Sequence, residues 1–267
     1  MKRRTFIRSL AAVSSFTLVG SASYGYKSSF VELSREELVL PQLKKRLKIV
    51  AISDLHAPSL YGSFENLAEL INQESPDIFI LAGDTVDRRG SESWVSVFRK
   101  VKARLAKLTV LGNWEYRGKL DLVQLKKEYE KAGFSLLVNK TVNVSGVSII
   151  GLDDFVHGCP DYHILKKIPN GLRPVFLISH CPESFDQIAA FPPNPVTVIS
   201  GHTHGGQIAP LGIVLYTPYG SGSYIKGWYL RGHHSMYVMR GIGTSGIPLR
   251  IGSKPEILVL NLVGCKA

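Results

Sequence analysis

Cysteine is scarce in this sequence, and the few cysteines form no pattern. Cys159, Cys181 and Cys265 include no Cys-x-x-Cys pair, which excludes a zinc knuckle and a dithiol redox motif. Their odd number also speaks against a framework of disulfides. The sequence has no internal repeat, no low-complexity stretch and no basic run interleaved with aromatic residues. A repeat architecture is therefore excluded, and no nucleic-acid-binding module is indicated.

Acidic residues are outnumbered, because 21 Asp and Glu stand against 32 Lys and Arg, giving a net charge of +11. Residues 1–22 contain four basic residues and no acid, so the chain without them would carry 11 − 4 = +7. This charge favours anionic partners such as phosphate esters, an anionic lipid membrane surface or nucleic acid, although a merely soluble basic surface explains it equally well. The hydrophobic content of 45% and the length of 267 residues are typical of a globular protein with a sizeable core.

Residues 1–22 have the pattern of a targeting segment. A basic stretch, 1–8, precedes a mostly apolar stretch, 9–20, that is short for a membrane-spanning helix, and small residues follow. Arg3 and Arg4, with Phe6 two positions on, resemble a twin-arginine export signal. We therefore expect the twin-arginine export machinery as a partner and a periplasmic or cell-envelope location, with a membrane anchor if the signal is not cleaved. An ordinary secretory signal or an uncleaved amphipathic anchor is the alternative.

Residues 23–46 form a lead-in segment with an edge strand expected at 30–33, and residues 47–263 are predicted to form one α/β domain. Apolar runs predict strands at 47–52, 77–82, 108–111, 142–152 (a strand pair), 175–179, 196–200, 213–215, 236–240 and 257–262. Apolar stripes with helical spacing predict helices at 64–72, 94–105 and 120–132. Strands and helices alternate up to residue 200, and only strands are expected after it.

Five predicted strands are each followed at once by residues of the types that bind metals. The clusters are Ser53-Asp54-Leu55-His56, Gly83-Asp84-Thr85-Val86-Asp87, Gly112-Asn113-Trp114-Glu115, Ser179-His180 and Gly201-His202-Thr203-His204. Ligands of open α/β sheets bind outside the carboxyl ends of the strands, so five such ends on one sheet would converge on one crevice. A single Asp-x-His occurs easily by chance in a chain of this length, whereas five such clusters indicate one common site.

The last cluster is part of the run Gly201-His202-Thr203-His204-Gly205-Gly206-Gln207. Neutral imidazole is the commonest metal ligand in proteins, and the neighbouring glycines allow the backbone to approach a ligand closely. Taken alone, the run is equally well explained as a polar loop with two chance histidines. The four other clusters favour the interpretation as a metal site.

The mixture of carboxylates, imidazoles and an amide oxygen suits a pair of divalent metal ions. Two such ions about 3.5–4 Å apart hold a phosphate and lower the pKa of a bound water, so that hydroxide attacks phosphorus near neutral pH. A pair of this kind needs a carboxylate that bridges both ions, and Asp84 is the natural candidate. Asn113 would add a neutral oxygen ligand.

Together these motifs resemble those of the calcineurin-like metallophosphoesterase superfamily. The sequence has D-x-H at 54–56, G-D-x-x-D at 83–87, G-N-x-E at 112–115, His180, and G-H-x-H at 201–204, in the order and spacing of that superfamily. It is most similar to a bacterial exported branch with G-H-T-H-G-G-Q at the last motif and a segment like 240–246. The resemblance covers nearly the whole chain from about residue 30. It implies an α/β fold in which two mixed β-sheets pack as a sandwich flanked by helices.

The resemblance also implies a ligand set of seven residues, which would be both the metal ligands and the catalytic residues. Asp54, His56, Asp84 and His204 would hold one divalent ion, and Asp84, Asn113, His180 and His202 would hold the other. Family members use manganese, iron, zinc and other metals, and oxygen and imidazole ligands without thiolate do not select among them.

One residue departs from the family pattern. Many members have histidine after the Asn of the third motif, where it protonates the leaving group or contacts the phosphate, but this sequence has Trp114. Indole does not transfer a proton at neutral pH. Either another acid replaces it while Trp114 merely packs beside the site, or the leaving group needs little protonation, as in a pyrophosphate. Trp114 would also offer a flat apolar wall to a base, sugar or lipid.

Six further residues lie close to the motifs. We expect Glu115 to orient the Asn113 loop and Asp87 to steady the second motif. Asp153 and Asp154 would support ligands or cap a loop. His157 is expected at the surface, with substitute acid at the cleft rim as the alternative, and Arg240 would contact phosphate or form a plain salt bridge.

The sequence therefore predicts a binuclear metal-dependent phosphoesterase acting on a phosphate-ester substrate. Phosphodiester or pyrophosphate cleavage on a lipid-linked or nucleotide-sugar substrate is our first expectation, and phosphomonoester cleavage the second. Some relatives resemble enzymes that cleave UDP-2,3-diacylglucosamine, although a UDP-sugar is cytoplasmic and fits poorly with export. The alternative of another class is a non-catalytic binding module on the same fold.

Overall fold

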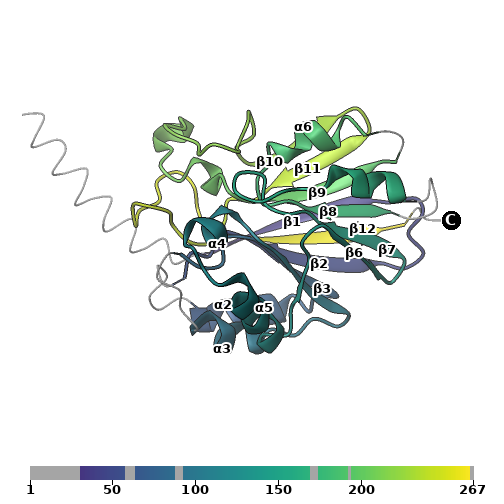
Figure 1. Ribbon diagram of the computed structural model, residues 1–267, viewed down its shortest axis with the longest axis horizontal. Helices are drawn as coiled ribbons and strands as arrows, with labels where there is room; N and C mark the ends of the chain where they lie inside the picture. The colour runs from purple at the N-terminus through teal and green to yellow at the C-terminus, as the bar shows by residue number, and fades with distance from the viewer. Residues whose placement is uncertain (1–30, 58–63, 88–92, 169–173, 192–193, 265–267) are drawn as a thin grey trace, which may run out of the picture.

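The computed structural model describes residues 31–57, 64–87, 93–168, 174–191 and 194–264 as two six-stranded sheets flanked by helices (Figure 1). The signal segment predicted at residues 1–22 lies outside these ranges. In the part of the chain that is described, no helix is both long enough and apolar enough to cross a membrane.

The first sheet has the strand order β1-β12-β2-β3-β4-β5. Its strands are β1 (Glu32–Val39), β2 (Leu47–Ile52), β3 (Ile78–Ala82), β4 (Ala106–Val110), β5 (Ser135–Leu136) and β12 (Glu256–Val263). β2 to β5 are parallel to one another, while β12 runs antiparallel to β2 and parallel to β1. The lead-in segment thus provides an edge strand that pairs along the whole of β12, and this strand extends beyond the predicted range 30–33.

The second sheet has the strand order β10-β11-β9-β8-β7-β6. Its strands are β6 (Lys140–Val144), β7 (Val147–Gly151), β8 (Val175–Ile178), β9 (Val196–Ser200), β10 (Gly227–Arg231) and β11 (His234–Val238). β7, β8, β9 and β11 are parallel, and antiparallel hairpins add β6 and β10 at the two edges. Both sheets are therefore mixed, as predicted.

Three apolar layers explain why the central strands are apolar on both faces. One layer lies between the sheets and includes Ile49, Ile78, Phe176 and Ile199. A second lies between the first sheet and the helices α2 (Phe64–Gln73), α3 (Ser93–Arg99) and α5 (Leu122–Lys131). The third lies between the second sheet and α6 (Ser184–Ile188) with the 3₁₀ helix η1 (Tyr162–Lys167). The predicted sandwich of two mixed sheets flanked by helices is confirmed.

Two secondary-structure predictions are wrong. The segment 213–215, predicted as a strand, is an irregular loop after the 3₁₀ turn η3 (Pro210–Gly212), and Ile213 and Leu215 face solvent instead of a partner strand. The helix predicted at 94–105 ends at Arg99, because the chain must return to begin β4 at Ala106. Leu105, expected to face inward, is 43% exposed. The edge strand β10 had no counterpart among the predicted strands.

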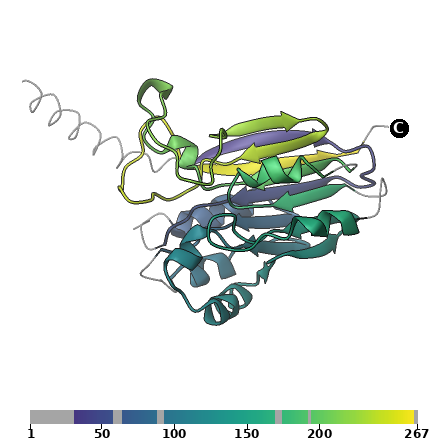
Figure 2. The same cartoon turned by 45° about the horizontal axis from the view of Figure 1, so that its top comes forward.

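The topology brings the five motif loops together at one end of the sandwich. Parallel β2, β3 and β4 end there in the first sheet, and parallel β8 and β9 end there in the second. Backbone hydrogen bonds join neighbouring loops, from Asp54 N–H to Gly83 O and from Gly201 N–H to His180 O. Figures 1 and 2 show loops that project from the sheets at this end of the sandwich.

Candidate metal centre

Side chains from all five motif loops converge on one buried cluster. His56 Nε2 lies 3.0 Å from His204 Nε2, and His202 Nδ1 lies 2.9 Å from Asn113 Oδ1. His204 Nε2 is 3.5 Å from Asp54 Oδ1. All seven residues that the sequence predicts as ligands are therefore brought together: Asp54, His56, Asp84, Asn113, His180, His202 and His204.

Asp84 lies at the centre of the cluster. Its Oδ2 is 3.2 Å from His180 Nε2 and 3.7 Å from His56 Nε2, two imidazoles that the sequence assigned to different metals. Its Oδ1 accepts the backbone N–H of Trp114 at 2.8 Å. One carboxylate oxygen is thus held by the protein, and the other faces both groups of ligands. This is the position that a bridging carboxylate requires.

Side chains of the cluster form overlapping groups whose donor atoms lie close enough together to hold a metal ion. Asp54, His56 and His204 place one ligand atom each within 4.8 Å of one another, and so do Asp54, Asp84 and His180. A third group of the same kind joins His180 and His202 to Cys181, a free buried thiol. The sequence did not assign Cys181 as a ligand, and its Sγ donates to Asp154 Oδ1 at 3.2 Å.

The backbone of the cluster is strained. Five of the seven residues have a positive φ in the left-handed region: Asp54 (52°), His56 (48°), Asp84 (52°), His202 (74°) and His204 (52°). This conformation costs a residue with a Cβ roughly 1–2 kcal/mol, and such residues concentrate at functional sites. In two of the loops this backbone accompanies two ligands that lie two positions apart and enter the same cluster, Asp54 with His56 and His202 with His204.

Close packing explains the glycine before Asn113. A Cβ on Gly112 would lie 2.3 Å from Asp84 Oδ1 and 2.9 Å from the His180 ring. Any larger residue would displace the central carboxylate. The glycine of the third motif is therefore required by the approach of the second and fourth motifs.

Burial makes most of the imidazoles neutral. It lowers the pKa of His56 to about 3 and that of His202 to about 4, and it lowers the pKa of His204 well below its ordinary value. Neutral imidazole offers the nitrogen lone pair that a metal ion needs. Burial also raises the pKa of Asp84 to about 7, because a carboxylate in this position has no water to solvate its charge.

His180 provides a direct test of whether a cation fits. Its Nδ1 lies 2.8 Å from the carbonyl oxygen of Ala82, so Nδ1 carries the proton and Nε2 carries the lone pair. Nε2 is buried and has no hydrogen-bond partner among the described residues, although it faces the carboxylates of Asp84 and Asp54. Burial would lower the pKa of His180, but these carboxylates raise it well above its ordinary value, so without a metal they favour a proton on Nε2, in the place where a divalent cation would bind the lone pair. A lone pair beside two buried carboxylates fits a divalent cation that binds all three.

Glu115 ties the second and third motif loops together. Its buried carboxylate accepts the backbone N–H groups of Thr85 at 2.7 Å, Gly112 at 2.9 Å and Asp84 at 3.2 Å. It also accepts the hydroxyl of Tyr129, on α5, at 3.2 Å. Glu115 therefore orients both loops, a wider role than the one expected for the Asn113 loop alone.

Arg250 is a buried residue of the site that the sequence reasoning missed. Its Nε donates to Gly243 O at 2.8 Å, and its Nη1 donates to His204 O and Ser253 O at 3.3 Å each. The guanidinium thereby joins the last motif loop to the segment 243–253. Arg250 lies 46 residues after His204 in a stretch without regular pattern, so no local signal in the sequence pointed to it.

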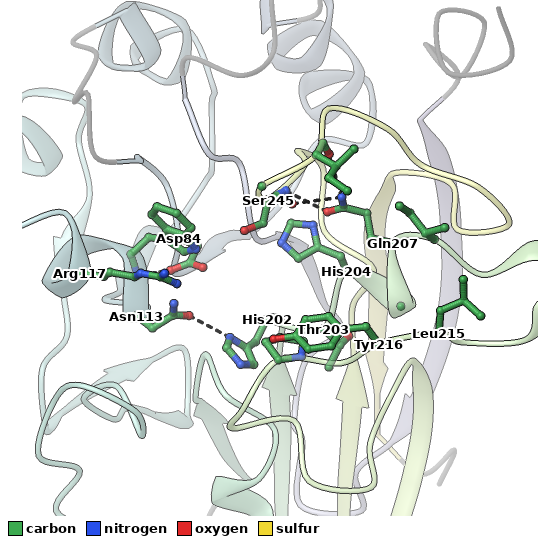
Figure 3. A pocket seen from close by; sticks show the side chains of 16 residues that line it. Asp84, Asn113, Arg117, His202, Thr203, His204, Gln207, Leu215, Tyr216 and Ser245 are labelled. Atoms are coloured by element: carbon green, nitrogen blue, oxygen red, sulfur yellow. Dashed lines mark hydrogen bonds between the residues drawn. The ribbon is translucent and has the colours of Figure 1, made fainter. Parts of the chain in front are cut away.

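An open pocket of about 440 Å³ lies over the cluster (Figure 3). Asp84, Asn113, His202 and His204 form part of its floor, and Trp114, Arg117, Leu215 and Tyr216 are among its walls. The Trp114 ring meets His56 edge-on at 5.7 Å between centroids, and Arg117 lies over the same ring at 4.9 Å. Trp114 therefore lies between the cluster and solvent, where a substrate would pass.

The other residues named from the sequence lie around the site without entering it. Asp153 and Asp154 cap their own loop, since their carboxylates accept the backbone N–H groups of residues 154, 156, 157 and 159. His157 is exposed and does not line the pocket, in agreement with the surface interpretation. Arg240 forms ion pairs with Glu256 and Glu32, in agreement with the salt-bridge alternative.

Known proteins with similar sequences point to the same chemistry. Residues 47–206 match the family model described as calcineurin-like phosphoesterase. The metallophosphoesterase YkuE of Bacillus subtilis is 32% identical over 98% of both chains, and the metallophosphoesterase Cj0846 of Campylobacter jejuni is 30% identical over 99% of this chain and 71% of its own. Among solved structures, Yfce, a phosphoesterase from E. coli, aligns with a TM-score of 0.39 and 16% identity over 76% of this chain and 85% of its own.

Proposed function

The chain belongs to the calcineurin-like phosphoesterase family, and we propose that it is a binuclear metal-dependent phosphoesterase. The observation that carries this proposal is the convergence of seven oxygen and nitrogen donors around Asp84, with the lone pair of His180 Nε2 facing two buried carboxylates. A buried group of this composition without a cation would leave costly unsatisfied charge and polar atoms.

The seven residues would hold two divalent ions. Asp54, His56, Asp84 and His204 would bind one, and Asp84, Asn113, His180 and His202 would bind the other, with Asp84 between them. The tautomer of His202 agrees with this assignment. His202 Nε2 lies 2.8 Å from the carbonyl oxygen of Tyr219, so Nε2 carries the proton and Nδ1, which faces Asn113, is free for a metal. Manganese, iron and zinc all fit such a donor set.

When bound, two such ions supply Lewis acidity toward a phosphate and lower the pKa of a coordinated water. The residues of the chain then position and shield the reaction. Glu115 and the backbone N–H of Trp114 fix the orientation of the Asp84 carboxylate and its loop. Arg117, exposed at the pocket wall, is placed to offset negative charge on a substrate phosphate.

The pocket favours a phosphodiester or pyrophosphate over a small monoester. Its walls include Trp114, Leu215, Tyr216 and Ile247, which would contact an apolar or flat group beside the scissile phosphate. We propose a lipid-linked or nucleotide-sugar substrate, of the kind represented by UDP-2,3-diacylglucosamine. Trp114 has no proton to give at neutral pH, which suits a leaving group that needs none, such as a phosphate.

Hydrolysis of a bis-aryl phosphate under manganese, iron and zinc in turn tests this function, with an aryl monophosphate and an aryl-substituted pyrophosphate in the same panel. We expect turnover of diester or pyrophosphate and a fall of at least about a thousandfold in kcat for Asp84→Asn, because an amide does not neutralise two cations. Metal content, measured by elemental analysis, should fall from two ions per chain in the same variant.

Each other outcome rejects a defined part of the proposal. Faster cleavage of the monoester would identify a phosphomonoesterase. Two bound metal ions with no turnover on any member of the panel would instead favour a binding module on this fold. A protein that binds no metal at all would contradict the site itself.

A further inference from the structure

Two loops at the mouth of the pocket expose large apolar side chains, and we call them the apolar rim. The first loop is 208–219, which follows the last motif, and the second is 245–247. Their large exposed side chains are Leu211, Ile213, Leu215, Tyr216, Tyr219 and Ile247, which are 57% to 100% exposed. In the described part of the chain only Val123 and Leu230 are other large apolar side chains as exposed as these, so such side chains gather at the entrance to the metal centre.

The apolar rim is held in shape by hydrogen bonds. Gln207 Oε1 accepts the N–H of Ser245 at 2.8 Å, and Gln207 Nε2 donates to the carbonyl oxygen of Ile247 at 2.9 Å (Figure 3). The N–H of Ala209 also donates to the carbonyl oxygen of Ile251 at 2.7 Å. These bonds fix the two loops to each other at the end of the sandwich (Figure 2). The hydrogen-bonded backbone of these loops therefore holds the apolar side chains in their exposed positions.

The conformation and exposure of Leu211 cost free energy in water. It has φ of 54°, next to Gly212 at 82°, and its side chain is 100% exposed at the tip of the turn. The left-handed conformation costs a leucine roughly 1–2 kcal/mol, and this side chain recovers nothing by burial within the chain. An apolar environment outside the protein would compensate the cost.

The charged residues near the apolar rim indicate which kind of apolar environment would cover it. No Asp or Glu occurs in residues 187–255, the 69 residues between Asp186 and Glu256 that contain both loops. Five Lys and Arg occur there, of which Arg231 and Arg240 pair with acids outside this range and Arg250 is buried. Arg117 adds a positive charge at the opposite wall of the pocket. Apolar side chains on two loops without acidic residues match the boundary between acyl chains and negatively charged headgroups.

We infer that the apolar rim inserts into the surface of an anionic phospholipid bilayer. Interfacial segments of this kind enter about 5–10 Å into the boundary between headgroups and acyl chains. The pocket mouth then faces the layer of lipid phosphates, and the metal centre lies directly behind it. The choice of a lipid phosphate as substrate rests on the proposed function, whereas the docking itself does not depend on catalysis.

Binding of the metal-loaded full-length protein to vesicles tests this inference. The vesicles are phosphatidylcholine alone, or an equal mixture with phosphatidylglycerol. The rim variant is Leu211→Glu with Ile213→Glu, neither of which lines the pocket. The matched control is Val123→Glu with Leu230→Glu, which adds the same charge at two other exposed apolar positions, on α5 and β10.

We expect the wild type and the control to sediment with the anionic vesicles, and the rim variant to lose about tenfold or more in partitioning. All three proteins should hydrolyse a soluble diester at the same rate. As a second measurement, Ile213→Trp should gain fluorescence that brominated lipid quenches.

Three results would overturn the inference. They are equal vesicle binding by the rim variant and the control, absence of fluorescence quenching by brominated lipid, and a wild-type protein that does not bind anionic vesicles. A dimer in solution that the rim substitutions dissociate would instead assign the surface to a second copy of the chain. Vesicle binding without any hydrolysis of the diester would reject the proposed function and leave the docking surface standing.

Discussion

The guanidinium of Arg250 lies 3.2 Å from the ring nitrogen Nδ1 of His204, and both side chains are buried. Burial lowers the pKa of Arg250 to about 10, so it remains a cation at neutral pH. A buried positive charge behind a metal-site imidazole is tolerated because three backbone carbonyl oxygens accept its N–H groups. The position of His204 therefore depends on a residue that lies far from it in sequence.

Replacing this guanidinium should loosen the last motif loop. Arg250→Met leaves the carbonyl oxygens of Gly243, His204 and Ser253 without their donor, and we expect the free energy of unfolding to fall by roughly 3 kcal/mol. Arg250→Lys should recover only part of this lost free energy of unfolding, because one ammonium group cannot reach all three acceptors. Urea unfolding measures both. Equal stability of the Met variant and the wild type would mean that the contacts contribute nothing.

Replacing the carboxylate of Glu115 should weaken metal binding without removing a ligand. Glu115→Gln turns one acceptor oxygen into an NH₂ group that faces backbone N–H donors of the second and third motif loops. We expect metal affinity to fall roughly 10- to 100-fold. Glu128→Gln is the matched control, because Glu128 is buried on α5 but pairs with Lys131 and Gln124. Metal titration by calorimetry gives both affinities, and an equal loss in the two variants would contradict the assignment.

Removing the metals should destabilise the folded chain. Each site that is saturated at about 100 times its Kd adds about 2.7 kcal/mol to the free energy of unfolding. For a domain of this size 1 kcal/mol corresponds to roughly 2–4 °C in Tm, so two such sites predict a fall of at least about 10 °C on chelation. Differential scanning calorimetry, first with chelator and then with manganese restored, measures this change in Tm. Asp84→Asn should show a much smaller difference, and an unchanged wild-type Tm would argue against buried metal sites.

The fold and the ligand set were accessible from sequence because both rest on local pattern. Buried central strands such as β2 and β9 are apolar on both faces, and each is followed directly by its ligands, so strand and site were identified together. Parallel strands of one sheet bring their carboxyl ends to one edge, which made the convergence of Asp54 and Asp84 predictable, whereas His202 reaches them from β9 of the second sheet.

The features that could not be predicted depend on contacts between residues far apart in the sequence, which leave no pattern in the local sequence. The apolar segment 213–215 has the composition of a strand, and only the lack of a neighbouring strand makes it an exposed loop. Glu115 and Arg250 act through backbone groups from distant loops, which spacing does not reveal. The left-handed backbone of His56 and Asp84 is likewise imposed by the cluster and not by residue type.

Export through the twin-arginine machinery remains a prediction from residues 1–22. Arg3→Lys with Arg4→Lys keeps the positive charge but removes the paired guanidinium groups that define the signal. We expect the wild-type protein in the cell envelope and the variant retained in the cytoplasm, as shown by fractionation and immunoblotting. Lys2→Arg is the control, since it leaves the pair intact. Export of the double variant at the wild-type level would indicate an ordinary secretory route.

Introducing a proton donor at Trp114 should change how the rate depends on the leaving group. The Trp114 backbone N–H holds Asp84 and its ring lines the pocket, so Trp114→His keeps the loop and places an imidazole beside the substrate. General acid catalysis contributes up to about 10²–10⁴-fold, and mainly to poor leaving groups. We expect about a tenfold gain for an aryl diester whose phenol has a pKa of about 10, and little change for more acidic phenols.

Trp114→Phe separates this effect from the loss of the indole, because phenylalanine keeps an aromatic wall and offers no proton. The measurement is the slope of log kcat against leaving-group pKa for the three proteins, on diesters with a common second substituent. A shallower slope in the His variant alone would show that the wild-type site lacks a general acid at this position, as expected for an enzyme whose natural leaving group is a phosphate. Parallel slopes in all three proteins would mean that another residue already supplies the proton.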